Sequence, residues 1–267
     1  MSIEEISPLL ATLTTIARQG GAIARHHFKA AGLNEVNEKA ARDYVTAGDV
    51  AVETAIAAAL AKAFPDWSIE GEESAGDRDC GEDAPRFLID PIDGTTNFAW
   101  GIPYFGVVIC LTRAGRVDAG VVYDPMRDEM FAAERGKGAY LNGERLKVRA
   151  GRDIEHAVIG ASLPIPGQVK SVTPDRYRQV LLDVMDNAAG MRRMGSAALS
   201  IAYVAASRHD AFFEDGLSPH DYAASTLIVE EAGGIISGFD GGIIPPSGAV
   251  LAASPAVHGW LVDRFKG

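Results

Sequence analysis

The chain has 267 residues, 47% of them hydrophobic, which is enough for one large domain or two closely packed halves with a substantial core. Its 36 acidic and 25 basic residues give a formal net charge of −11 without a basic block, a balance that argues against nucleic-acid binding. The two cysteines, Cys80 and Cys110, show no CxxC or Cys/His spacing, which argues against a zinc site or a disulfide scaffold and fits a reduced, cytoplasmic setting.

The N-terminal segment predicts a helix that packs on the core. Its start is acidic rather than basic, unlike a signal peptide, and no apolar run in the chain approaches the length of a membrane span. Apolar residues between positions 4 and 30 recur at nearly helical spacing, and Gly20 with Gly21 can bend this helix. Residues 33–48 are polar and aperiodic, so they predict a mobile loop from which Lys39 could reach a phosphate.

A second helix and a short strand follow this loop. Thr46 is a good N-cap for the helix, and Asp49 in its first turn can satisfy the helix dipole. Residues 67–74 predict a strand that runs into a turn with three acids in four positions. In isolation these acids fit a solvated loop, but one of them becomes a good third carboxylate ligand if other acids lie nearby.

The stretch around which the chain is organised is 90–98, Asp-Pro-Ile-Asp-Gly-Thr-Thr-Asn-Phe. It follows an apolar run at 86–89 that predicts a buried strand, and Pro91 should end that strand. Asp90 and Asp93 then stand three residues apart. A plain turn with a capping aspartate explains an isolated DxxD pattern, but the full nine-residue string is far more specific.

The residues after the two acids predict a phosphate site. Gly94 lets the chain turn, and Thr95 and Thr96 can cap a short helix whose first backbone N–H groups are free. Acids beside such a helix start are compatible only if a cation lies between them. We therefore expect the acids to bind Mg²⁺ and the N–H groups to bind a phosphate.

The rest of the chain favours an α+β fold rather than a doubly wound one, because residues 104–149 predict antiparallel strands without crossover helices. The strands predicted there are 104–112, 117–123, 129–133, 139–141 and 146–148. Later elements are strands at 157–161, 211–214, 235–237 and 250–252 and helices at 174–187, 197–206 (capped by Ser196), 222–232 and 255–265. Asp221 near a helix start is either a cap or a ligand, and His220 is interpreted as a wall residue of the site.

In combination, these blocks resemble the inositol monophosphatase family over essentially the whole chain. The matching blocks, in order, are Gly-Glu-Glu-Ser at 71–74, the nine residues at 90–98, Gly-Ser-Ala-Ala at 195–198, Asp-Tyr-Ala-Ala at 221–224 and Glu-Glu-Ala-Gly-Gly at 230–234. The resemblance implies a layered α/β/α/β/α sandwich of the inositol monophosphatase and fructose-1,6-bisphosphatase type. It also implies a single domain over 1–267, with approximate halves 1–150 and 151–267, and usually a homodimer.

The resemblance also implies a role for each matching residue. Glu72, Asp90 and the Ile92 carbonyl would bind a first Mg²⁺; Asp90, Asp93 and Asp221 would bind a second; and Glu72 would serve a weaker third ion. Thr95 with Glu72 would orient and activate the attacking water, and Asp49 would lie behind Thr95. Backbone N–H groups of Gly94 and Thr95 would hold the phosphate, Lys39 corresponds to a lysine of a mobile loop, and Gly195, Ser196, Ala197 and Glu214 match positions at the substrate alcohol.

Three departures from the family pattern concern the substrate side. His220 stands where the family usually has Trp, Trp100 stands where His is common, and the segment between Lys39 and Asp43 is one residue short. None of these changes removes a predicted metal ligand, but they weaken the transfer of inositol specificity.

The expected function is a Mg²⁺-dependent phosphomonoesterase acting on a small polyol or sugar phosphate, in the first place inositol 1-phosphate. The alternatives within the class are fructose-1,6-bisphosphatase, histidinol-phosphatase and 3',5'-bisphosphate nucleotidase. A second phosphate would need a basic clamp, for which Arg192 and Arg193 are the evident candidates. The resemblance further implies lithium sensitivity, and a non-enzymatic alternative is a scaffold that binds the transcription machinery.

Overall fold

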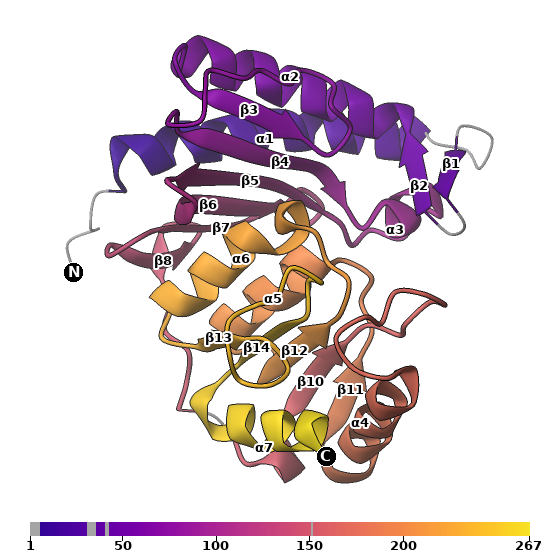
Figure 1. Cartoon of the computed structure of the whole chain (residues 1–267). Helices are drawn as coiled ribbons and strands as arrows, with labels where there is room; N and C mark the ends of the chain where they lie inside the picture. Colours follow the sequence, from indigo (N-terminus) through magenta and orange to yellow (C-terminus); the bar gives the residue numbers. More distant parts are fainter. Residues whose placement is uncertain (1–5, 31–35, 41–42, 151) are drawn as a thin grey trace.

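The computed structural model describes residues 6–30, 36–40, 43–150 and 152–267, and the side chains of 6–28, 46–150 and 152–267. Five layers stack in Figure 1: helices, a seven-stranded sheet, helices, a five-stranded sheet and helices. This architecture confirms the predicted layered α/β/α/β/α sandwich. The helices are α1 (Pro8–Ala30), α2 (Ala47–Ala63), α3 (Thr95–Ala99), α4 (Pro174–Asn187), α5 (Ala197–Ala205), α6 (Pro219–Glu231) and α7 (Pro255–Lys266), with a short 3₁₀ turn, η2 (Ile154–His156).

The seven-stranded sheet has the strand order β3-β4-β5-β6-β7-β8-β9. Its strands are β3 (Ser68–Gly71), β4 (Arg86–Asp93), β5 (Gly106–Arg113), β6 (Arg116–Asp124), β7 (Glu129–Glu134), β8 (Gly138–Leu141) and β9 (Glu144–Arg145). All neighbours are antiparallel except β3 and β4, which run parallel. The prediction of a strand at 146–148 was wrong: pairing ends at Arg145, and the Val148 N–H leaves the sheet to bond the Ala232 carbonyl at 2.8 Å.

The five-stranded sheet has the strand order β11-β10-β12-β14-β13. Its strands are β10 (Val158–Ala161), β11 (Gly190–Arg192), β12 (Ala211–Glu214), β13 (Ile235–Ser237) and β14 (Val250–Ala253). Here β10 lies parallel to both β11 and β12, whereas β14 is antiparallel to its neighbours. The short β11 was not predicted, because three residues between a helix and a polar turn give no periodic signal.

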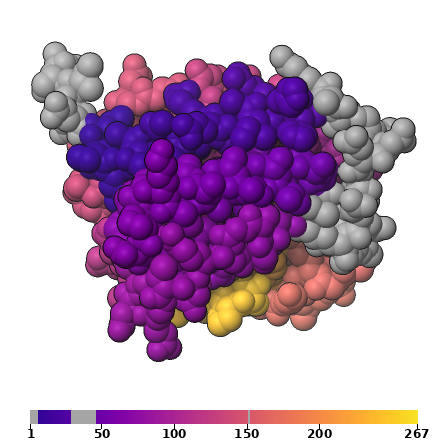
Figure 2. Space-filling model, turned by 90° about the horizontal axis from the view of Figure 1, so that it is seen from above, coloured from indigo at the N-terminus to yellow at the C-terminus, as the bar shows by residue number. Residues whose placement is uncertain are grey.

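Three apolar cores separate the layers. The first lies between α1, α2 and one face of the seven-stranded sheet, the second surrounds α5 and α6 between the two sheets, and the third lies under α4 and α7. Figure 2 shows α1 and α2 side by side across one face of the molecule. Gly20 and Gly21 permit this packing: a Cβ at Gly20 would lie 2.7 Å from Ile56 Cδ1, and one at Gly21 2.4 Å from Tyr123 Cε1.

The prediction of a loop over residues 33–48 was wrong where the structure describes them. Strand β1 (Val36–Ala40) pairs antiparallel with β2 (Asp43–Thr46). The two strands are too short and too polar for an alternating apolar pattern to reveal them. Lys39 belongs to β1, but its side chain lies outside the described ones. None of the helices in the described ranges is both long and apolar enough to cross a membrane.

Candidate active site

The centre of the site is the end of β4, where the predicted stop at Pro91 was wrong. The strand continues to Asp93, and its pairing with β5 becomes irregular between Asp90, which faces Val108, and Asp93, which faces Gly106. This bulge accommodates a residue without an N–H. The Ile92 N–H donates to Asp90 Oδ1 at 3.0 Å, which fixes the Asp90 carboxylate beside the backbone.

Two further acids reach Asp90 from other elements. Oxygens of Glu72, Asp90 and Asp221 all lie within 4.8 Å of one another. Glu72 follows β3, which runs parallel to β4, and the Glu72 N–H donates to the Ile89 carbonyl at 3.0 Å. Asp221 lies in the first turn of α6, where it also caps the helix by accepting the Ser218 N–H at 2.6 Å. The cap and the cluster therefore use the same aspartate.

The electrostatics of the cluster favour a bound cation. Burial raises the pKa of Asp90 well above its usual value, and the charges of Glu72, Asp93 and Asp221 raise it further. Because the negative charges of four carboxylates act on one another here, a hard divalent cation would stabilise their ionised forms. The donor set is all oxygen, which suits Mg²⁺ rather than zinc.

Asp93 faces the start of α5 in the other half of the chain. Its Oδ2 accepts a hydrogen bond from the Ser196 hydroxyl and a second one, of 2.9 Å, from the Ala198 N–H. Its Oδ1 accepts the Ala197 N–H at 3.1 Å. Burial nevertheless raises the pKa of Asp93 to about 7, because desolvation outweighs these bonds. Ser196 is the N-cap of α5, as predicted.

Two glycines allow the turn after β4 and the turn before α5 to lie in close contact. Gly94 has φ of 100°, and a Cβ there would lie 2.9 Å from the Gly195 carbonyl oxygen. Gly195 has φ of 84°, and its Cβ would lie 2.9 Å from Asn97 Nδ2. Both conformations favour glycine, so two separate sequence motifs are explained by one close contact. The N-cap of α3 is Gly94 rather than the predicted threonine, since Gly94 takes the left-handed conformation there.

Thr95 and Asp49 lie together behind the acids. Thr95 Oγ1 is 3.1 Å from the Ile92 carbonyl and 3.5 Å from Asp49 Oδ1. The other carboxylate oxygen of Asp49 accepts the Thr46 N–H at 2.9 Å and the Thr46 hydroxyl at 2.6 Å. Burial raises the pKa of Asp49 to about 6. The N-terminal cap of α2, which the sequence predicted, therefore fixes one carboxylate oxygen of Asp49, and the other carboxylate oxygen, Oδ1, faces Thr95.

A cavity of about 260 Å³ opens beside Asp93 and Asp221. Its lining includes the predicted substrate residues Gly195, Ser196, Ala197 and Glu214, together with Thr96, Ser162, Arg193 and Ser200. Gln168 Nε2 donates to Glu214 Oε1 at 3.1 Å, and burial raises the pKa of Glu214 to about 7. The polar part of the cavity wall thus consists of hydroxyls, carboxyls and a guanidinium, which suit a hydroxylated ligand.

His220 points elsewhere. It does not line this cavity, and its Nε2 lies 3.8 Å from Glu70 Oε1 on β3. The structure thus places His220 next to the cluster residue Asp221 but turned toward the edge of the seven-stranded sheet.

The structure also adds a residue that the sequence interpretation missed. Glu53 lies on α2 one turn after Asp49, is 1% exposed, and accepts backbone N–H groups from the turn that carries Glu72. The sequence does indicate that Glu53 is unusual, because this acid interrupts the apolar helix face formed by Val52 and Ile56.

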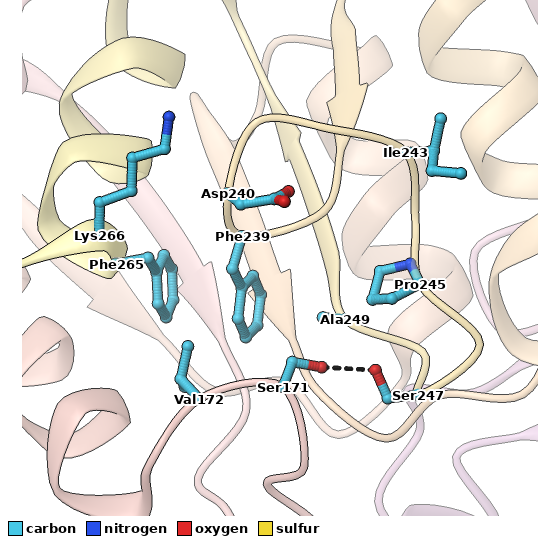
Figure 3. A pocket seen from close by; sticks show the side chains of 10 residues that line it. All are labelled: Ser171, Val172, Phe239, Asp240, Ile243, Pro245, Ser247, Ala249, Phe265 and Lys266. Carbon is cyan, nitrogen blue, oxygen red and sulfur yellow. Dashed lines mark hydrogen bonds between the residues drawn. The ribbon is translucent and has the colours of Figure 1, made fainter.

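A larger cavity, about 390 Å³, lies between α7, the 239–249 loop and residues 171–172. Figure 3 shows Phe239, Phe265 and Val172 on one side of it and the hydrogen-bonded pair Ser171–Ser247 below. None of the clustered carboxylates lines it. Size alone therefore does not identify the candidate active site.

Comparisons with known proteins identify the family of the chain. The model of the inositol monophosphatase family matches residues 5–266. A Pseudomonas aeruginosa protein named Nus factor SuhB is 44% identical over 88% of this chain and 87% of its own. A Mesorhizobium japonicum inositol-1-monophosphatase is 39% identical over 97% of both chains. The crystal structure of the extragenic suppressor protein suhB from Bartonella henselae superposes with a TM-score of 0.90 at 38% identity, covering 97% of this chain and 99% of that one. The chain belongs to the inositol monophosphatase family.

Proposed function

We propose that this protein is a Mg²⁺-dependent phosphomonoesterase that hydrolyses a small polyol phosphate, in the first place inositol 1-phosphate. The observation that carries the proposal is the convergence of Glu72, Asp90 and Asp221 from three separate elements, with oxygens within 4.8 Å of one another, beside a polar cavity. The name of the Mesorhizobium relative supports the choice of substrate.

The residues around β4 would hold two to three Mg²⁺ ions. Glu72, Asp90 and the Ile92 carbonyl would serve one ion, Asp90, Asp93 and Asp221 a second, and Glu72 a weaker third. When bound, the ions neutralise the phosphate dianion, lower the pKa of a water molecule and stabilise the leaving alkoxide.

The chain's own groups would orient the reactants. Thr95 and Glu72 would hold the attacking water, with the Glu72 carboxylate accepting its proton, while Asp49 keeps the Thr95 hydroxyl in place. Backbone N–H groups of Gly94 and Thr95 at the start of α3 would bind phosphate oxygens, because the first N–H groups of a helix have no partner within it. Lys39 on β1 would place a positive charge beside the phosphate.

The cavity would bind the alcohol. Glu214, whose Oε1 accepts a hydrogen bond from Gln168, would also accept a substrate hydroxyl, and Ser196 and Ala197 at the start of α5 would contact the ring near the ester oxygen. Arg193 in the same lining would offer a positive charge to a second anionic group, so the bisphosphates are also candidate substrates. We assign His220 a contact with the substrate only if its variants alter KM.

A second candidate function is binding to the transcription machinery, which the name Nus factor SuhB of a 44% identical relative favours. This role is compatible with an active phosphatase site. We further expect a homodimer, which sedimentation of the purified protein would test, and a cytoplasmic location, which fractionation of cells would test.

The deciding experiment is phosphate release from inositol 1-phosphate, fructose 1,6-bisphosphate, histidinol phosphate and adenosine 3',5'-bisphosphate, each with and without Mg²⁺. Mg²⁺-dependent preference for inositol 1-phosphate supports the proposal, and preference for another compound reassigns the substrate. A pull-down with Asp90→Asn, whose metal site is disabled, separates the two candidates: a scaffold keeps its transcription partner, and a pure phosphatase has none.

A further inference from the structure

We propose that Glu53 is a positioning residue: its buried carboxylate anchors the turn that presents Glu72 to the ion site. The inference rests on the proposed function through the role of Glu72. Glu53 lies on α2, is 1% exposed and belongs to none of the motifs that define the site. Its position on a rigid helix makes it a fixed support for a turn that is otherwise at the surface.

Both oxygens of Glu53 are used by this turn. Oε2 accepts the Glu73 N–H at 2.8 Å, and Oε1 accepts the Ala75 N–H at 2.5 Å. By contrast, Glu72 and Ser74 themselves are exposed. A charged acceptor strengthens both bonds, so the peptide that follows Glu72 is tied to α2.

Gly71 makes this contact possible on the other side of Glu72. A Cβ on Gly71 would lie 2.2 Å from the carboxyl carbon of Glu53, so the carboxylate occupies the space that any other side chain would fill. The Gly71 N–H donates to Asp77 Oδ1 at 2.8 Å, and the Glu72 N–H donates to the Ile89 carbonyl at 3.0 Å. The backbone on both sides of Glu72 is therefore fixed before any ion binds.

This anchoring has a chemical consequence. Glu72 is the one member of the three-acid cluster that comes from an exposed turn, so its carboxylate would otherwise lose conformational freedom on binding an ion. Supports of this kind behind a ligand change metal affinity by about 10- to 100-fold when they are removed. Glu53 thus tunes ion affinity without touching the ion.

Two test variants and one control probe the assignment. Glu53→Gln keeps the shape but presents one NH₂ group to a backbone N–H, so one of the two bonds is lost. Gly71→Ala leaves every charge in place but displaces the Glu53 carboxylate. Glu82→Gln, which removes an exposed carboxylate from the following loop, is the matched control.

The first readout is amide hydrogen exchange in the absence of metal. We expect exchange at Glu73 and Ala75 to rise about 10-fold or more in Glu53→Gln and in Gly71→Ala, and to stay unchanged in Glu82→Gln. Unchanged exchange in both test variants would overturn the proposal.

The second readout is Mg²⁺ affinity by calorimetry, together with the Mg²⁺ dependence of phosphate release. Both test variants should bind Mg²⁺ about 10-fold or more weakly, and excess Mg²⁺ should restore kcat. A variant that is merely misfolded would lose kcat at all Mg²⁺ concentrations and melt earlier. In a Glu53→Ala background, Gly71→Ala should add little, because the group it displaces is gone; additive losses would contradict the proposed contact.

The result for the wild-type protein separates this inference from the proposed function. If wild type binds no Mg²⁺, the phosphatase proposal and the ion-positioning role of Glu53 fall together, and the exchange data still report whether Glu53 holds the turn. If wild type binds Mg²⁺ and turns over, but the variants bind it equally well, only the inference about Glu53 fails.

Discussion

The two sides of the candidate site are built differently. On the metal side, Asp90 and Asp93 are fixed by the end of β4, and the turn of Glu72 is held by backbone hydrogen bonds to β4 and α2. On the alcohol side, the cavity is formed by the start of α5, the end of β12 and the loop that carries Gln168. On the metal side, three of the four acids lie within residues 72–93 and belong to specific sequence blocks, and Asp221 comes from α6; the alcohol side has no comparably specific block. This difference explains why a class of reaction is easier to infer here than a substrate.

The largest effect should come from the metal side, at Asp90. Asp90→Asn removes a charge that the proposed assignment shares between two ions, so we expect kcat/KM to fall about 10³-fold or more, on the order of 4 kcal/mol in barrier. Phosphate release at saturating Mg²⁺ measures it, with Glu82→Gln as the control. Loss of less than about 10-fold would contradict a shared-ligand role for Asp90.

Lithium should act on the same side. The family resemblance implies that Li⁺ replaces the second ion beside Asp93 and Asp221, and we expect millimolar Li⁺ to inhibit turnover. Titrating Li⁺ at several Mg²⁺ concentrations measures the effect. Turnover that is insensitive to Li⁺ throughout would remove this expectation while leaving the phosphatase proposal in place.

A variant on the alcohol side should weaken substrate binding more than it slows the chemical step. Glu214→Gln should raise KM for inositol 1-phosphate about 10-fold, or about 1.4 kcal/mol, with a smaller change in kcat. Steady-state kinetics measure the split. Equal losses in kcat and kcat/KM would instead place Glu214 in the chemistry itself.

The stability difference between Glu214→Gln and the wild-type protein should depend on pH. The pKa of Glu214 is raised to about 7 in the fold, so its contribution to stability is present below its unfolded pKa and is lost as the pH rises through about 7. Glutamine does not titrate. Glu214→Gln should therefore gain about 1–2 kcal/mol over wild type at about pH 8 and nothing at about pH 4, as measured by denaturant unfolding without metal.

The smallest effect should come from His220. Its ring does not line the cavity and faces Glu70, so His220→Trp, which introduces the residue usual in the family, should change kcat/KM by less than about three-fold. A large rise in KM would instead support the predicted wall role. Thr54→Ala, at an exposed position of α2, provides a neutral reference.

On the metal side, the sequence predicted several of the elements that carry the acids, because these elements follow local patterns. The strand before Asp90, the cap at Thr46 and the helix start at Ser196 follow from periodicity and capping rules. The end of β4 was mispredicted, because Pro91 lies in a bulge whose pairing partners on β5 come from elsewhere in the chain. The break that Glu53 makes in the apolar face of α2 was visible in the sequence, but its role was not, because its partners lie in a turn about 20 residues away.

The alcohol side was predictable only through resemblance. Gln168 and Ser162 come from a loop without periodicity, and their proximity to Glu214 depends on how β10 and β12 pair. Helix α6 starts at Pro219 rather than at the predicted residue 222, so His220 lies in its first turn instead of before the helix. Such placements depend on tertiary contacts that a single sequence does not specify.

The hydrogen bonds between Asp93 and α5 have a consequence for exchanging parts between relatives. This carboxylate belongs to the first half of the chain, yet its oxygens are bound by Ser196, Ala197 and Ala198 of the second. Oδ2 already accepts two donors, so Oδ1 is the oxygen with a lone pair to spare. A chimera joined near residue 150 would therefore inherit catalysis only if the incoming helix start preserved this fit, and the two halves must be inherited as a matched pair.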